Sequence, residues 1–308
     1  MPVQQHVYQK THNGEIIFYS SRDAIVFFTT FCAVARKHGV APVALCIMPE
    51  HLHGLYKADC RGDLSPFIKE YSRFFTLQFN KDISRRGSLF KPRFGCAAKA
   101  GSKSIRTINA YIANNPVEKR SCLRAEEYRW NFLAYAVSDH PFSDKLIIRK
   151  AGSNMKKAVR VVDYLRNRNQ PIGYKIYDRI SEKLGTVEKM QLIDYIISSY
   201  NVLDYTALLS CYKSYEGMLE AFANTKGAEY DLKEDFDSYS NRNYSRIALF
   251  LKEEYGVEKP KDVLRLPHER RLLLAGILTQ RRLAPEFQVR KYLHLFDGGD
   301  MLAFSARG

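Results

Sequence analysis

The sequence predicts an α+β domain over residues 1–140, followed by an all-helical domain over residues 150–308. Compact apolar runs and strand-like alternation occur only in the first of these regions, where they are interleaved with helical patterns. In the second region the apolar residues recur almost entirely at helical spacing. A chain of 308 residues is long enough for two domains, and the polar segment 138–154 is the expected linker between them.

Eight elements are expected in the first region. In chain order they are extended segments at 5–10 and 15–19, a helix at 21–38, strands at 41–48 and 51–57, a helix at 63–81, a strand with a loop at 84–95, and a helix at 102–115. Ser21 and Gly39 are suited to the two ends of the first helix. The continuous apolar run before Pro49 is typical of a buried strand, whereas the strand after it alternates in polarity.

Capping residues and prolines predict the ends of the later helices in this region. Asp63 can cap the second helix, and Pro116 is expected to stop the third, because the residue before a proline is disfavoured in the α conformation. The resulting order of strands and helices favours a mixed sheet with helices against one face.

The second region is expected to consist of helices and one polar loop at 223–241. The predicted helices cover 155–168, 175–184, 187–200, 204–211, 214–222, 242–256, 267–281 and 285–295. Within 259–293, two helical stripes flank a short break, as in a helix-turn-helix DNA-binding segment, and the second stripe carries Arg290 and Lys291. A packed piece of a helical bundle is the alternative interpretation.

The net charge of +15 and the pI of about 9.5 indicate a polyanionic partner, either nucleic acid or an anionic membrane surface. Residues 1–150 hold 23 basic and 12 acidic residues (net +11), and the remainder holds 25 and 21 (net +4). Neither an 18-residue apolar run nor an apolar signal-peptide core is present, so a soluble cytoplasmic protein is expected. The six cysteines form no CxxC pair and are expected to be reduced, structural thiols.

Two short sequence patterns indicate a candidate metal site and a candidate nucleophile. On a strand, His51 and His53 project from the same face and can share one cation, although a histidine pair without a ligand role is the alternative. On a helix, Tyr111 and Asn115 lie one turn apart, so the Asn115 amide oxygen can add a third ligand. A tyrosine hydroxyl with a pKa near 10 needs activation to act as a nucleophile, and the alternative for Tyr111 is an ordinary core tyrosine.

The order and content of these motifs resemble a known family. The chain reads Met48-Pro49-Glu50-His51-Leu52-His53, then Tyr111-Ile112-Ala113-Asn114-Asn115-Pro116-Val117, then Tyr128-Arg129-Trp130-Asn131. Over roughly residues 1–137 it resembles the single-tyrosine HUH transposases (named for histidine, hydrophobic residue, histidine), especially the REP-associated tyrosine transposases.

The resemblance implies a ferredoxin-like (RRM-like) catalytic domain in which His51, His53 and Asn115 ligate Mg²⁺ or Mn²⁺. It implies that Tyr111 attacks single-stranded DNA at hairpins, forms a 5′-phosphotyrosine and transfers the strand. Glu50 can also reach the metal, but it is expected to be a solvated carboxylate at the strand end. A domesticated, non-catalytic hairpin-binding protein and a phosphodiesterase that uses water remain alternatives, and both a monomer and a homodimer remain open.

A basic segment provides the candidate contacts to the DNA backbone. It interleaves cations with Phe90 and Phe94, which suits phosphate binding and base stacking, although a solvated basic face is the alternative. The candidate DNA-binding residues are Arg85, Arg86, Lys91, Arg93, Lys103 and Arg106 here, and Arg290 and Lys291 near the C-terminus.

Overall fold

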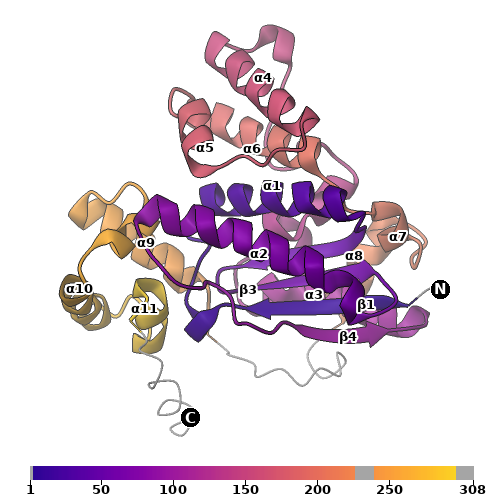
Figure 1. Cartoon of the computed structure of the whole chain (residues 1–308), viewed down its shortest axis with the longest axis horizontal. Helices are drawn as coiled ribbons and strands as arrows, with labels where there is room; N and C mark the ends of the chain where they lie inside the picture. Colours follow the sequence, from indigo (N-terminus) through magenta and orange to yellow (C-terminus); the bar gives the residue numbers. More distant parts are fainter. Residues whose placement is uncertain (1–2, 226–238, 296–308) are drawn as a thin grey trace, which may run out of the picture.

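The computed structural model describes residues 3–225 and 239–295, and its centre is a four-stranded antiparallel sheet (Figure 1). The strands are β1 (Gln4–Lys10), β2 (Pro42–Met48), β3 (His51–Lys57) and β4 (Gly95–Lys99), and their order in the sheet is β2-β3-β1-β4. One helix joins β1 to β2 and another joins β3 to β4. This is the predicted α+β, ferredoxin-like arrangement.

These two helices, α1 (Ser21–His38) and α2 (Arg61–Ile83), close one face of the sheet. The carboxylate of Asp23 accepts the backbone amides of Tyr19 and Ser20 at the start of α1, and Gly39 ends the helix in the left-handed conformation at φ 64°. Between the helices and the sheet lie rings such as Phe31, which are fully buried. The core between these helices and the sheet is therefore apolar and largely aromatic.

The opposite face is also covered, so the expectation of helices against one face alone was wrong. Helix α3 (Ser102–Glu118) packs there with α7 (Tyr205–Leu209) and α8 (Tyr215–Asn224). The apolar sequence of β2 explains this second layer. Its side chains are apolar on both faces, so Val43 and Cys46 point away from α1 and α2 and are buried by other helices.

Several boundaries differ from the sequence prediction. Helix α2 begins at Arg61, so Cys60 is its N-cap and the expected cap Asp63 lies in its first turn. Helix α3 continues through Pro116 to Glu118, because a proline in the last turn removes only one amide hydrogen bond before the helix ends. Segment 15–19 is not a strand; its amides instead bond to the carbonyls of Lys291 and Pro49. The strand expected within 84–95 starts only at Gly95, after a loop.

Apart from α7 and α8, the helices of the second region pack in two groups. Helices α4 (Ser153–Asn167), α5 (Tyr174–Ser181) and α6 (Thr186–Tyr200) stack above α1 and extend its core (Figure 1). Helices α9 (Arg242–Tyr255), α10 (His268–Gln280) and α11 (Glu286–Leu293) form another apolar cluster with Ile16. Most of the predicted 223–241 loop lies outside the described residues, and the division into domains at 140–150 stays a prediction.

Short 3₁₀ helices link these elements. They are η1 (His12–Gly14), η2 (Ala125–Glu127), η3 (Arg129–Asn131), η4 (Leu133–Ala136), η5 (Ile148–Lys150) and η7 (Pro260–Arg265). All six cysteines are free thiols. In the described part of the chain, no helix combines the length and apolarity that a bilayer span requires.

A buried ion network connects the C-terminal helices to the first core. The Lys261 ammonium lies 2.7 Å from an Asp23 carboxylate oxygen and 2.8 Å from one of Asp82. Arg22 binds Asp82 at 2.7 Å and Asp178 at 2.6 Å. Because every charge in the network has a partner of opposite sign, the network can lie between helices without an unpaired buried charge.

Candidate functional site

Strand β3 and helix α3 bring the predicted ligands together. His51 Nε2 is 3.1 Å from Asn115 Oδ1, and His53 Nε2 is 3.3 Å from Asn115 Nδ2. The two imidazole rings are 4.9 Å apart and almost perpendicular. Alternation along β3 places both rings on the α3 side of the sheet, with Leu52 in the core on the other side. The Nε2 atoms of both histidines thus converge on one side-chain amide.

A third histidine, His6, belongs to the same cluster and was missed at the sequence level. It lies on β1, and its Nε2 is 3.3 Å from His53 Nδ1, with the two rings stacked at 5.5 Å. Only the β1–β3 register, in which His6 is opposite Leu55 and Tyr8 is opposite His53, could have located it. No periodicity within either strand contains that register.

Burial keeps the inner histidines neutral. It lowers the pKa of His6 to about 3, with a smaller contribution from the charge of Lys99, and lowers the pKa of His53 well below its usual value. Because Asn115 Nδ2 donates to His53 Nε2, the assigned proton of His53 lies on Nδ1 and is donated to His6. A neutral imidazole is the form that binds a metal ion.

Glu50 is not the solvated carboxylate that was expected. Its side chain is 13% exposed, and one carboxylate oxygen lies 3.6 Å from His51 Nδ1. Burial raises the pKa of Glu50, but the hydrogen bond and charge of His51, with the charges of Lys291 and Lys119, outweigh this and lower it below the ordinary value. The turn before β3 folds the carboxylate inwards, where it can orient the His51 ring.

Tyr111 lies one turn before Asn115 on α3 and contacts the histidines edge-on. Its ring centroid is 5.2 Å from that of His53 and 5.9 Å from that of His6. Tyr111 is only 3% exposed and Asn115 only 4%. The tyrosine is therefore next to the candidate ligands but covered, and a DNA strand could reach its hydroxyl only after the covering groups move.

The donor set suits a divalent ion, although one ligand is unusual. Among the described residues, no group of three or more His, Cys, Asp and Glu side chains is arranged to hold a metal. The cluster reaches three donors only when the amide oxygen of Asn115 joins the two imidazole nitrogens, and such a mixed nitrogen and oxygen set is compatible with several divalent ions. Among the described residues, the nearby Glu50 Oε2 and His6 Nδ1 are buried without hydrogen-bond partners. Unpaired polar atoms of this kind are typical of a site that also binds a ligand or an ion.

The predicted DNA-binding residues are spread over several surfaces. Arg86, Lys91, Arg93, Lys103 and Arg106 are exposed. Arg85 is partly buried and binds the carbonyls of Gly87 and Ser88, so it also shapes its own loop. Their contacts to DNA stay predictions.

The helix-turn-helix candidate corresponds to α10 and α11, and its role in DNA binding also stays a prediction. Arg290 on α11 pairs with Glu286. Lys291 lies beside Gly14, and its charge helps to lower the pKa of Glu50. Gln288 is 1% exposed and bonds to Asn243, so its amide is occupied within the protein.

The comparison with family models agrees with the motifs. Residues 4–115 match the family model described as "Transposase IS200 like". We refer to these residues as the IS200-like segment. The match supports a transposase-type function, as the motifs predicted, and the IS200-like segment contains His51, His53, Tyr111 and Asn115.

The comparison with curated proteins found no match. Among solved structures, the chain is similar to the "REP associates tyrosine transposase bound to a REP hairpin", with 19% identity and a TM-score of 0.36. The similarity covers 41% of this chain and 74% of that chain.

Proposed function

We propose that the protein is a metal-dependent DNA nickase and strand transferase that cleaves single-stranded DNA at hairpins through a 5′-phosphotyrosine on Tyr111. One observation carries the proposal. In the segment that matches the IS200-like family, the Tyr111 ring contacts His53, and the side-chain amide of Asn115 bonds to the Nε2 atoms of both His53 and His51. A cytoplasmic location agrees with the expected substrate, and the choice between monomer and homodimer stays open.

The reaction conserves bonds. The Tyr111 oxygen attacks the scissile phosphorus, the bond from phosphorus to the 3′-oxygen breaks, and a phosphotyrosine bond forms. The phenol loses its proton and the departing 3′-oxygen gains one. Attack by a 3′-hydroxyl on the phosphotyrosine reverses these changes, so rejoining needs no ATP.

His51, His53 and Asn115 would hold Mg²⁺ or Mn²⁺. When bound, the ion would polarise the scissile phosphate and stabilise the charge that develops during attack. Glu50 and His6 would act behind the ligands, because each meets the ring nitrogen that faces away from Asn115. Such partners fix the tautomer and the orientation of a ligating histidine.

A non-catalytic hairpin-binding protein is the second candidate. The burial of Tyr111 at 3% exposure favours it, because a nucleophile must reach its substrate. Under the first proposal, DNA binding must therefore uncover the tyrosine. The two candidates differ in a single product, the covalent adduct.

The test is incubation with single-stranded hairpins from the DNA that flanks the gene, with Mg²⁺ or Mn²⁺, followed by denaturing electrophoresis. We expect an adduct and a shortened strand, both of which disappear in Tyr111→Phe while hairpin binding persists. Tyr164→Phe, at an exposed tyrosine on α4, is the matched control and should react normally. Tight binding without an adduct under any ion would favour the second candidate, and cleavage that survives Tyr111→Phe would indicate attack by water.

A further inference from the structure

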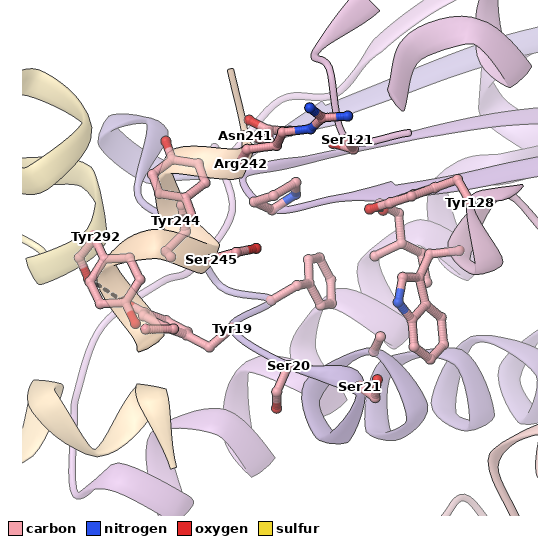
Figure 2. A pocket seen from close by; sticks show the side chains of 17 residues that line it. Tyr19, Ser20, Ser21, Ser121, Tyr128, Asn241, Arg242, Tyr244, Ser245 and Tyr292 are labelled. Carbon is pink, nitrogen blue, oxygen red and sulfur yellow. Dashed lines mark hydrogen bonds between the residues drawn. The ribbon is translucent and has the colours of Figure 1, made fainter. Parts of the chain in front are cut away.

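A cavity of about 380 Å³ lies beside the turn that leads into β3, outside the histidine cluster (Figure 2). One wall comes from Ser20, Ser21 and Tyr128, and the opposite wall comes from α9 and α11. Figure 2 shows Tyr244 and Ser245 on one side of the cavity, Tyr128 on the other, and Arg242 beside Ser121. Its size is within the range of small-ligand sites, roughly 300–1,000 Å³.

The lining combines flat rings with a cation. Phe18, Tyr128 and Trp130 line the cavity and are only partly buried. Arg242 is exposed at its edge. Aromatic rings that stack on bases, next to a cation for the backbone or a base edge, are the components of a single-strand binding site.

Two polar groups of the lining have no partner. Asn241 is 8% exposed and Tyr292 is 1% exposed, yet among the described residues neither Asn241 Nδ2 nor the Tyr292 hydroxyl has a hydrogen-bond partner. A buried polar group without a partner destabilises the fold, so two in one cavity point to a polar ligand. Asn241 Nδ2 and the Arg242 guanidinium can only donate, which favours a ligand edge rich in acceptors.

The cavity adjoins both elements of the candidate active site. Pro49, which lines it, directly precedes Glu50 and His51, and its carbonyl accepts the amide of Ile17. On the other side, the backbone N–H of Asn241 donates to the carbonyl of Lys119, at the end of the helix that carries Tyr111. A nucleotide in the cavity would therefore lie at the ends of the two segments that hold the catalytic groups.

We infer that this cavity binds one unpaired nucleobase of the DNA substrate, and that guanine fits best. The aromatic rings stack on the base, while Asn241 and Arg242 donate to the O6 and N7 acceptors that guanine presents. The inference rests on the proposed function for its substrate class. It goes beyond that function because about half of the residues that line the cavity come after residue 115, outside the IS200-like segment.

Trp130 makes the cavity directly observable, because it is the single tryptophan of the chain. The full-length protein, without metal, is titrated with dGMP, dAMP, dCMP, dTMP and deoxyribose 5-phosphate while tryptophan fluorescence is recorded. We expect saturable quenching that is strongest with dGMP and absent with the base-free sugar phosphate. Equal quenching by all five compounds, preference for another base, or no quenching would overturn the assignment.

Variants on α9 separate the cavity from general charge effects. Arg242→Ala should weaken dGMP binding about tenfold, as expected for the loss of a charge-assisted hydrogen bond, whereas Arg246→Ala, one turn further along and outside the cavity, should not. Ser245→Tyr should fill the opening and abolish quenching, whereas Leu249→Tyr, at an exposed site outside the cavity, should leave it intact. Equal effects within either pair would contradict the inference.

The same variants distinguish this inference from the proposed function. If Tyr111 forms an adduct but Ser245→Tyr leaves hairpin affinity and cut position unchanged, the cavity is not a base site and the proposed function stands. If dGMP quenches Trp130 but no adduct forms under any condition, the base site stands and the catalytic proposal fails.

Discussion

The two faces of the sheet are buried to a similar degree but are built from different chemistry. The α1 and α2 face is aromatic and aliphatic, with rings such as Phe27 and Phe75 fully enclosed. The α3 face is apolar over β2, but over β1 and β3 it carries His6, His53 and Asn115 against Tyr111. One face can be explained by packing alone, whereas the other buries several polar groups that packing does not require.

We infer from this difference that the α3 face carries the function. Buried polar groups destabilise a fold unless they are hydrogen-bonded. Among the described residues, Glu50 Oε2 and His6 Nδ1 have no hydrogen-bond partner, so this cluster lowers the stability of the fold. The apolar face can supply the stability that tolerates this cluster. Substitutions on the two faces should therefore separate stability from activity.

Adjacent residues of β3 give the largest expected contrast. His53→Ala should abolish cleavage and strongly weaken metal binding, because it removes a proposed ligand, and should lower the free energy of unfolding less than Leu52→Ala does. Leu52→Ala, on the other face and 3% exposed, should lower the free energy of unfolding by about 2–5 kcal/mol. Urea denaturation and metal titration by calorimetry measure the two quantities. Equal loss of stability in both variants would contradict the division between the faces.

A substitution at Glu50 tests whether this carboxylate orients the proposed metal ligand His51. Glu50→Gln should weaken metal binding by roughly 10–100-fold, because the carboxylate that orients His51 loses its charge. Glu70→Gln is the matched control, since Glu70 pairs with Lys37 and His38 away from the histidine cluster. Unchanged metal affinity in Glu50→Gln, measured by calorimetry, would remove Glu50 from the site.

The ion network next to the apolar face should make stability depend on pH. Burial raises the pKa of Asp82, but Arg22 and Lys261 outweigh this and lower it from 3.8 to about 2. Because the folded pKa lies below the unfolded value, the stabilisation is complete above pH 4 and is lost as pH falls through about 2. Its size is about 2 kcal/mol.

Denaturation of Asp82→Asn between pH 2 and 7 measures this contribution. The variant should be less stable than the parent protein at neutral pH, and the difference should shrink towards pH 2. A difference that stays constant over this range would show that Asp82 acts only through its shape.

The smallest effects are expected at the exposed cations. Arg86→Ala or Arg93→Ala should each lower the slope of log affinity for a hairpin against log salt by about 1, through loss of one phosphate contact. Binding assays at several salt concentrations, with Lys157→Ala on α4 as the control, measure this. An unchanged slope in both variants would favour a solvated basic face.

Local patterns were enough to predict much of this arrangement. Alternation placed His51 and His53 on one side of β3, and helical spacing placed Tyr111 one turn from Asn115. These relations involve residues two or four apart, so strand and helix geometry determines them. The ferredoxin-like sheet with its two crossover helices was implied by the family resemblance, whereas the order of elements alone predicted a mixed sheet and not the antiparallel one observed.

What could not be predicted depends on contacts between distant segments. His6 joins the cluster only through the register of β1 against β3, and Glu50 is buried only because the preceding turn folds inwards. The base cavity combines residues near 20, 128 and 242, which no local pattern connects. Helix α3 also continues past Pro116, because a proline near a helix end costs less than one inside it.

The most direct test of the central claim is to identify the residue that carries DNA after reaction with a hairpin. The full-length protein is trapped with a cleavable hairpin and Mn²⁺, digested with protease and nuclease, and analysed by tandem mass spectrometry. The account predicts a nucleotide phosphate on the Tyr111 hydroxyl and on no other tyrosine. A nucleotide on a different residue, or efficient cleavage with no modified peptide, would contradict it.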